Sequence, residues 1–271
     1  MFDESKNHFL DAVREHNPLI HNITNLVSAH FTANGLLALG ASPMMAESPD
    51  EMAELATISS AVVLNLGTPS DEKVSAMLAA GMAANQAGVP VVLDPVAVGA
   101  SHLRQKTVAT LTQNIQFAAI RGNAGELAYL ADVQWASKGV DAGQGSGNLA
   151  EIAQKVAQKF NTIAVLSGEH DFVANHDRVM KLSNGVALFP KVTATGCLLS
   201  AIVGAFLAVA PRELAFQAAC EACTVYAIAG ELAAVGLQAT QSGTFAVRLL
   251  DALAAIDATQ TEQLMKAEWI I

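Results

Sequence analysis

The strongest constraint on the fold is a regular order of short apolar runs and helical segments. The runs cover residues 42–45, 61–67, 90–96, 117–121 and 162–168, and their hydrophobicity is continuous rather than alternating. Continuous runs of this length are typical of strands buried on both faces of a parallel sheet. Helical segments separate them at residues 49–59, 70–87, 101–113, 123–130 and 148–160. The order predicts an α/β fold with a largely parallel central sheet flanked by helices on both faces.

Further elements extend this plan at both ends of the chain. We expect a helix over residues 5–15, a strand over 20–23, a helix capped by Asn25 or Ser28 and ending at Gly40, a hairpin over 170–184, and helices over 211–235 and 242–257. The Gly-rich residues 138–147 indicate a flexible loop, because a phosphate loop would need Gly-Lys-Ser/Thr after it. Without a repeat or a linker, residues 1–271 are expected to form a single domain.

Charge and hydropathy exclude several classes of partner. The net charge is −10 and basic residues form no cluster, so neither nucleic acid nor an anionic membrane is expected as a partner. The N-terminus has no signal-peptide pattern, and the longest uncharged apolar stretch, residues 197–210, is too short to span a bilayer. A cytoplasmic protein is therefore expected. Because 52% of residues are hydrophobic and only 15% are charged, a buried subunit interface is also expected.

The stretch KVTATGCLLSAIVGAFLAVA, residues 191–210, predicts a helix that starts near Gly196 or Cys197. A helix start presents free N–H groups and a positive dipole end, which together form an anion site. The same field would lower the pKa of the Cys197 thiol. The alternative is that small residues only allow close packing and that Cys197 is a core residue. Cys220 and Cys223 form a CxxC without a second ligand pair, which favours core packing over metal or redox chemistry.

Polar residues follow the apolar runs, at the edge of a parallel sheet where ligands bind. Asn65, Gly67 and Thr68 follow one run, Asp94 ends the next, residues 121–126 follow the fourth, and residues 167–169 follow the fifth. Asp94 and Glu126 at neighbouring strand ends predict a Mg²⁺ site facing bound phosphate, held directly or through water. The alternatives are a structural strand-end carboxylate and an ordinary first-turn helix charge. Arg121 is either a cation of the same site or a surface ion-pair partner.

Six blocks, in this order over nearly the whole chain, resemble the hydroxyethylthiazole kinase family of thiamin salvage. They are HNITNLVSAHFTANGLLALGASPMMAESPDEM, LNLGT, LDPVAVGAS, RGNAGE, LSGEHDFV and TATGCLLSAIVGAFLAV. The resemblance implies a ribokinase-like fold, ATP as co-substrate and Mg²⁺ as metal. It also implies phosphorylation of 4-methyl-5-(2-hydroxyethyl)thiazole, and a homotrimer with active sites between subunits.

The resemblance also implies roles for particular residues. It assigns Asn25, Met45, Gly67 and Ala194 to the thiazole pocket, Arg121, Asn123, Ser167, Gly168, Thr195 and Gly196 to the nucleotide and its phosphates, and Asp94 and Glu126 to the metal. Cys197 falls where related sugar kinases keep an Asp base. The family usually has Gly where this chain has Ala194; if that position needs a positive φ, the extra methyl affects the fit of the substrate.

Three alternative functions stay open at this point. One is a kinase of another small alcohol, such as hydroxymethylpyrimidine. A second is a cysteine-dependent hydrolase or acyl transferase with Cys197 as nucleophile, which would need an oriented histidine that no spacing nominates. A third is a nucleotide-binding module without catalysis, against which the two carboxylates and the cysteine argue.

Overall fold

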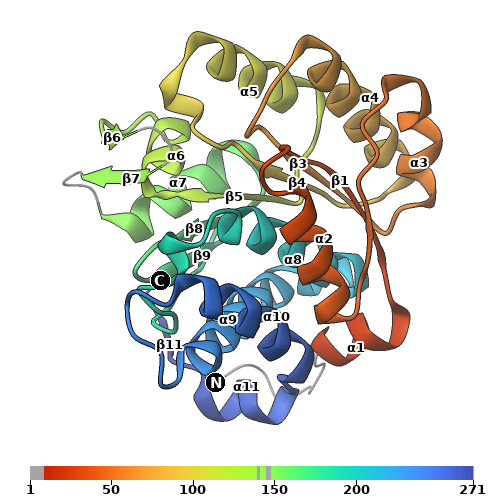
Figure 1. The fold of residues 1–271 in the computed structure, drawn as a ribbon. Coiled ribbons are helices and arrows are strands. Elements are labelled where there is room, and N and C mark those ends of the chain that lie inside the picture. The colour runs from red at the N-terminus through yellow and green to blue at the C-terminus, as the bar shows by residue number, and fades with distance from the viewer. Residues whose placement is uncertain (1–8, 139–140, 145–147, 271) are drawn as a thin grey trace.

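The computed structural model describes residues 9–138, 141–144 and 148–270, and its centre is a nine-stranded sheet (Figure 1). The strand order is β11-β10-β9-β8-β5-β4-β3-β1-β2. Neighbours from β2 to β8 pair in parallel, whereas β9, β10 and β11 continue the sheet in antiparallel fashion. The strands are β1 Leu19–Ile23, β2 Ser42–Met44, β3 Ala61–Asn65, β4 Val91–Asp94, β5 Ala119–Asn123, β8 Ile163–Ser167, β9 Asp171–Ala174, β10 Val179–Leu182 and β11 Ala267–Trp269. The predicted largely parallel sheet is confirmed.

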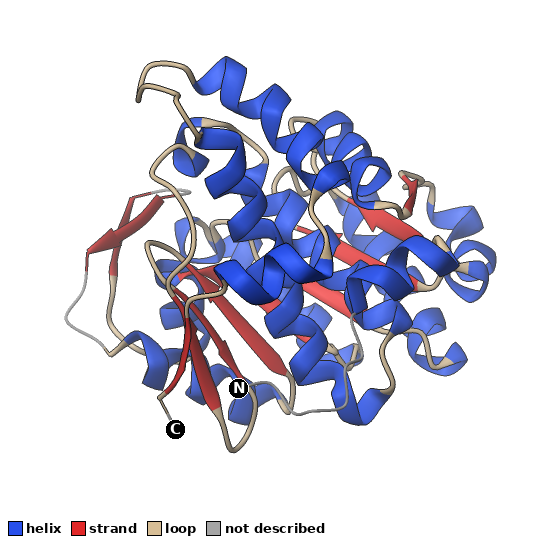
Figure 2. Cartoon of the chain, turned by 90° about the horizontal axis from the view of Figure 1, so that it is seen from below, coloured by secondary structure: helices blue, strands red, loops and turns tan. Residues whose placement is uncertain are grey.

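Helices cover both faces of this sheet (Figure 2). They are α1 Phe9–His16, α2 Ala29–Leu39, α3 Met52–Ile58, α4 Asp71–Ala87, α5 His102–Asn114, α6 Ala124–Leu130, α7 Leu149–Phe160, α8 Thr195–Val209, α9 Ala215–Ala234, α10 Ser242–Ala255 and α11 Ala258–Leu264. One buried apolar cluster joins one sheet face to α1, α2, α8, α9 and α10, and a second joins the other face to α3–α7. None of these helices is long and apolar enough to cross a membrane.

Strand β3 illustrates why the apolar runs are continuous. Ala61 and Val63 belong to one cluster, whereas Val62 and Leu64 belong to the other. Successive side chains of a strand point to opposite faces, and here both faces are buried, so an apolar residue is needed at every position. The continuous apolar runs in the sequence therefore indicate a sheet that is covered by helices on both faces.

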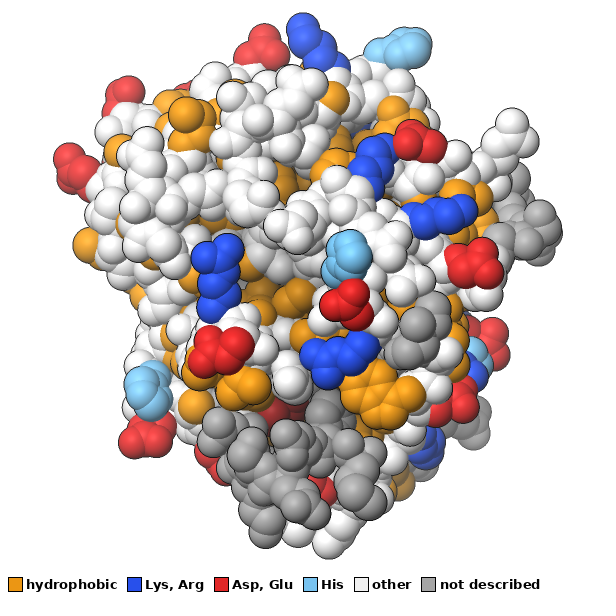
Figure 3. Space-filling view, turned by 180° about the vertical axis from the view of Figure 1, so that it is seen from behind, with side chains coloured by type: hydrophobic (Ala, Val, Ile, Leu, Met, Phe, Trp, Pro, Cys, Tyr) orange, Lys and Arg blue, Asp and Glu red, His pale blue; other side chains and the backbone are white. Residues whose placement is uncertain are grey.

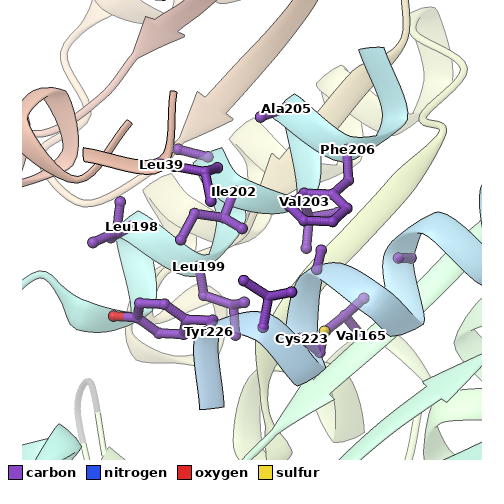
Figure 4. Packing of buried hydrophobic residues seen from close by; sticks show 14 of the residues in the cluster. Leu39, Val165, Leu198, Leu199, Ile202, Val203, Ala205, Phe206, Cys223 and Tyr226 are labelled. Carbon is purple, nitrogen blue, oxygen red and sulfur yellow. The ribbon is translucent and has the colours of Figure 1, made fainter. Parts of the chain in front are cut away.

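Helix α8 lies close to the middle of the sheet and packs against α9 and α2 (Figure 4). Ile202 and Phe206 are fully buried in the cluster that also holds Leu39, Cys223 and Tyr226. A Cβ added at Gly204 would lie 2.9 Å from Val63 Cγ2, so this glycine allows the helix to approach β3. Burial of Cys220 and Cys223 confirms that the CxxC is part of the core.

Three segments differ from the sequence prediction. Residues 138–147 were expected to form a loop, but β6 Ala136–Lys138 pairs with β7 Asp141–Gln144 as a separate two-stranded sheet; residues 139, 140 and 145–147 lie outside the described residues. Backbone pairing between two short segments needs no apolar pattern, so the glycine content was misleading. Two further elements were not predicted: strand β11, whose three residues are all exposed, and helix α11. Residues 5–8 of the first predicted helix lie outside the described residues.

Side chains of both charges are interspersed over the face of the molecule in Figure 3. Lysine and arginine side chains lie beside acidic ones there, among hydrophobic and uncharged groups. Long-range attraction of a polyanion needs a broad area of one sign. On this face, a bound anion would be held by local contacts rather than by the overall field.

Candidate active site

A chain of buried hydrogen bonds joins the carboxyl ends of three strands. Asn25, just after β1, donates from Nδ2 to Asn65 Oδ1 at 2.8 Å, and Asn65 Nδ2 donates to Asp94 Oδ2 at 2.9 Å. Asn65 and Asp94 are partners in the β3–β4 register. Ser200 of α8 donates to the same Asp94 oxygen at 2.7 Å. The chain therefore fixes the strand ends against α8.

Asp94 keeps one carboxylate oxygen available. Its side chain is 1% exposed, and Oδ1 has no hydrogen-bond partner among the described residues. Arg121 Nη1 lies 3.7 Å from Oδ2. Burial raises the pKa of the Asp94 carboxyl, although Arg121, Ser200 and Asn65 favour the charged form. A buried carboxylate oxygen without a partner is costly, which indicates a ligand at this point.

Glu126 is held by the backbone on both oxygens. Asn123 caps α6 by accepting from the Glu126 N–H, and Glu126 Oε2 accepts from Asn123 N at 2.7 Å, which is a complete capping box. Glu126 Oε1 accepts from Ala97 N at 2.8 Å. Burial and the neighbouring Asp94 raise the pKa of the Glu126 carboxyl, against the effect of these N–H groups.

The carboxylates fit the Mg²⁺ site predicted from the sequence. Asp94 Oδ1 is available for direct contact, whereas both Glu126 oxygens already accept N–H groups, so Glu126 would act through water. In the described parts of the chain, three or more His, Cys, Asp or Glu side chains never gather as a ready metal cage. Magnesium is commonly held by one or two carboxylates, water and substrate phosphates, and this set is of that kind.

Arg121 lies between the strand ends and the start of α8. It belongs to β5, its side chain is 12% exposed, and its Nη2 donates to Ser167 Oγ at the end of β8. A Cβ added at Gly196 would lie 2.6 Å from Arg121 Nη1, so only glycine allows the guanidinium this close to the helix. Gly168, next to Ser167, donates its N–H to Asp171 Oδ1 at 3.0 Å.

The first turn of α8 has the unpaired N–H groups that the predicted anion site requires. The first hydrogen bond inside the helix runs from Leu198 N to Ala194 O, so the N–H groups of Thr195, Gly196 and Cys197 have no acceptor within the helix. Tyr226 Oη donates to Thr195 O at 2.9 Å and holds this turn in place. Ala194 has a φ of 72°, the left-handed conformation in which glycine is favoured.

The expectation that the helix dipole lowers the pKa of Cys197 is wrong. Burial raises the pKa of the thiol, and the negative charge of Asp94 raises it further. Asn25 Nδ2 donates to Sγ at 3.4 Å, and this contact, Ser28 and Arg121 lower the pKa by less. Burial and the charge of Asp94 therefore outweigh the effect of the helix dipole on the thiol. The direction of this pKa shift favours the thiol of Cys197 over its thiolate.

The residues assigned to the thiazole pocket meet beside Cys197, except for Met45. A Cβ added at Gly67 would lie 2.5 Å from Asn25 Nδ2, and Gly67 N donates to Asn65 Oδ1 at 2.9 Å. Met45 is half-buried and follows β2, on the opposite side of β1 from β3. Met45 therefore lies at the edge of the sheet, apart from the other residues assigned to the pocket.

Sequence reasoning missed several residues that build the site. Asn65 was expected only at a strand end, and Ser200, Arg104 and Lys73 were not singled out. Ser200 was detectable as a polar residue inside the apolar helix α8, one turn after Cys197. Arg104 donates to the carbonyls of Leu66, Gly67 and Val96. That set of contacts joins two loops and is invisible in the local sequence.

The three-layer arrangement, with a helix start facing the carboxyl ends of parallel strands, is a ribokinase-like fold. Pyridoxal kinase from Staphylococcus aureus, solved in complex with AMP-PCP, shares this fold with a TM-score of 0.59 at 13% identity, over 77% of this chain and 87% of that chain. At the level of sequence, the model of the hydroxyethylthiazole kinase family matches residues 10–259. The chain belongs to this family.

Individual relatives agree with this assignment. The chain is 57% identical over 255 residues to hydroxyethylthiazole kinase of Histophilus somni, covering 94% of this chain and 96% of the relative. The corresponding protein of Listeria monocytogenes is 51% identical over 259 residues, 96% of both chains. The structure of a hydroxyethylthiazole kinase protein from Pyrococcus horikoshii superposes with a TM-score of 0.85 at 33% identity, covering 97% of this chain and 98% of that one.

Proposed function

We propose that this protein transfers the γ-phosphoryl group of ATP to the hydroxyl group of 4-methyl-5-(2-hydroxyethyl)thiazole, as in thiamin salvage. The observation that carries the proposal is the meeting of the α8 start, Arg121, Asp94 and Cys197 at one point, in a chain of the hydroxyethylthiazole kinase family. Each of these groups has a place in phosphoryl transfer, where positioning and charge neutralisation dominate.

The α8 start and Arg121 would bind the transferred phosphoryl group. Three N–H groups and a guanidinium lying against Gly196 supply donors and positive charge without bulky side chains. Because these donors are fixed before the substrate arrives, they favour the charge distribution of the transition state. Ser167 orients Arg121, and Asn123 and Gly168 form the strand ends beside it.

Cys197 would receive the acceptor alcohol together with Asn25. Its neutral thiol accepts a hydrogen bond from Asn25, so the sulfur is oriented toward the pocket side of the site. The loose transition state needs little deprotonation of the alcohol before transfer, so a weak base suffices. The raised pKa of the thiol opposes a nucleophilic cysteine mechanism, and the hydrolase alternative is therefore not favoured.

Asp94 and Glu126 would hold Mg²⁺, Asp94 through Oδ1 and Glu126 through water. When bound, the metal supplies neutralisation of phosphate charge. We also propose a homotrimer, a cytoplasmic location and a single domain over residues 1–271. Their support is the sequence pattern and the family resemblance, with 12 large hydrophobic side chains exposed on the described surface.

The test is release of ADP from MgATP with the thiazole alcohol, with hydroxymethylpyrimidine, and without an acceptor. We expect ADP only with the thiazole alcohol, and none after chelation with EDTA. Asp94→Asn keeps the shape of the side chain and removes its charge, and should lower kcat by roughly 10²-fold or more. Equal rates with both alcohols would refute the proposed specificity, and turnover in EDTA would refute the role of the carboxylates.

A further inference from the structure

The segment that follows β2, residues 45–47, is held by side chains of other elements. It lies between the end of β2 at Met44 and the 3₁₀ turn that begins at Pro49. His21 of β1 is fully buried, and its Nε2 lies 2.9 Å from Ala46 O; since a carbonyl oxygen only accepts, Nε2 carries the proton. Lys73 Nζ, from α4, lies 3.0 Å from Glu47 Oε2. The segment is thus fixed at two successive residues.

Lys73 makes a second contact, on the acceptor side of the site. Its Nζ donates to Thr24 O at 3.0 Å. Thr24 directly precedes Asn25, whose amide donates to Cys197 Sγ. One ammonium group therefore links the segment that carries Met45 to the segment that carries Asn25.

Lysine is an unexpected residue at this position. The Lys73 side chain is 8% exposed, and burial of an ammonium group is costly unless its donors are satisfied. It also lies in the first turn of α4, where the helix dipole favours negative charge, as in the adjoining Asp71 and Glu72. A residue that opposes two local preferences and joins two loops of a site is a candidate for a functional role.

We propose that Lys73 is a positioning residue for the acceptor alcohol. It sets the separation between Met45 and Asn25, the two side chains assigned to the thiazole pocket, and Glu47 is its partner. The inference rests on the proposed function, because it assigns the pocket beside Asn25 to the alcohol. The nucleotide groups around Arg121 are attached to other strands, so Lys73 acts on the alcohol and leaves ATP unaffected.

Steady-state kinetics of Lys73→Met separates these effects. We expect the KM for the thiazole alcohol to rise about tenfold, with kcat and the KM for ATP within about twofold of the unaltered enzyme. Glu47→Ala should raise the same KM about threefold, whereas Glu47→Gln, whose amide oxygen still accepts from Lys73, should restore most of the loss. Glu47 is half-exposed, so its variants remain informative if Lys73→Met folds poorly.

Lys159→Met is the matched control. Lys159 Nζ also donates to one carbonyl, Leu130 O at 2.9 Å, and one carboxylate, Asp132 Oδ2 at 2.6 Å, but on α7. This variant should leave every kinetic constant unchanged. An unaltered KM in Lys73→Met, or equal changes in both lysine variants, would overturn the positioning role.

Amide hydrogen exchange of the peptide covering residues 42–48 provides a readout that needs no substrate. Faster exchange in Lys73→Met than in Lys159→Met is expected, and equal exchange would overturn the inference even where KM rises. If the unaltered enzyme releases no ADP with the thiazole alcohol, the proposed function fails instead. The two failures are therefore distinguishable.

Discussion

Cys197 is the residue at which local chemistry and tertiary context disagree most. The start of α8 favours a thiolate, whereas burial and Asp94 favour a thiol, and the thiol prevails. Alkylation with iodoacetamide at pH 8 should therefore be slower than for a free small thiol, with its rate rising only toward higher pH. Cys220 and Cys223 are fully buried, so Cys197→Ala should incorporate no label in the folded state. Rapid labelling at neutral pH would contradict the raised pKa and revive the nucleophile mechanism.

Kinetics of Cys197 variants test the role of the thiol in transfer. A group that only orients or accepts a proton contributes about 10²–10⁴-fold, so Cys197→Ala should be slow and yet measurable. Cys197→Asp should retain or exceed the activity of the thiol, because a carboxylate is a stronger acceptor at the same position. A complete loss in both variants would indicate an obligate nucleophile, and an unchanged rate in Cys197→Ala would leave Cys197 as a packing residue.

Ala194 carries backbone strain at the anion site. An L-residue with φ near 72° is disfavoured by roughly 1 kcal/mol, whereas glycine is not. Ala194→Gly should therefore leave the free energy of unfolding unchanged or raise it by up to about 1 kcal/mol, measured by urea denaturation. The control is Ala109→Gly at an exposed position of α5, which should lose about 1 kcal/mol. Equal losses in both variants would show that the methyl of Ala194 stabilises the turn.

Helix α5 controls two loops of the site through one side chain. Arg104 Nη1 donates to Val96 O at 2.7 Å and to Leu66 O, and Nη2 donates to Gly67 O at 2.7 Å. A lysine cannot reach all three carbonyls from one nitrogen, so Arg104→Lys should lower the free energy of unfolding by about 1–3 kcal/mol.

Arg248→Lys is the matched comparison, because Arg248 is exposed and donates to one carbonyl, Val235 O at 3.0 Å. It should change the free energy of unfolding by no more than about 0.5 kcal/mol. Urea denaturation of both variants measures the difference. If both variants lose the same free energy of unfolding, the three contacts of Arg104 contribute no more than the single contact of Arg248.

At the scale of elements, the sequence predicted those strands and helices whose residues form a local pattern of apolar or small side chains. The apolar runs became β3, β4, β5 and β8 because burial on both faces requires an apolar residue at each position. The start of α8 was marked by small residues before an apolar run. By contrast, β11 is exposed throughout and pairs only because β10 is beside it.

The candidate site could be predicted only in part, because several of its contacts depend on the tertiary fold and leave no local pattern in the sequence. Asp94, Arg121 and Cys197 are visible as polar residues at the ends of elements, and the structure brings them together. The contact between Asn65 and Asp94 depends on the strand order, which no local pattern encodes. Lys73 resembles an ordinary helix charge in the sequence, and only its burial and its contacts with Thr24 and Glu47 single it out. The pKa of Cys197 likewise depends on tertiary burial.

At the scale of the whole molecule, the proposed trimer has a surface that tests it. Leu26 and Val27 are 78% and 64% exposed in the β1–α2 loop, directly after Asn25. In the proposed trimer, a second copy of the protein would cover these two apolar side chains. Light scattering after gel filtration should give three times the 28.1 kDa of one chain.

Val27→Asp should shift this mass toward one chain, because a charge without a partner in an interface opposes assembly. If active sites lie between subunits, turnover should then fall with dilution of the variant and recover at higher protein concentration, since assembly follows mass action. Ile58→Asp on α3, where Ile58 is 65% exposed, is the control and should retain both mass and turnover. A monomeric unaltered protein with full activity would contradict the trimer, because each site would then be complete within one chain.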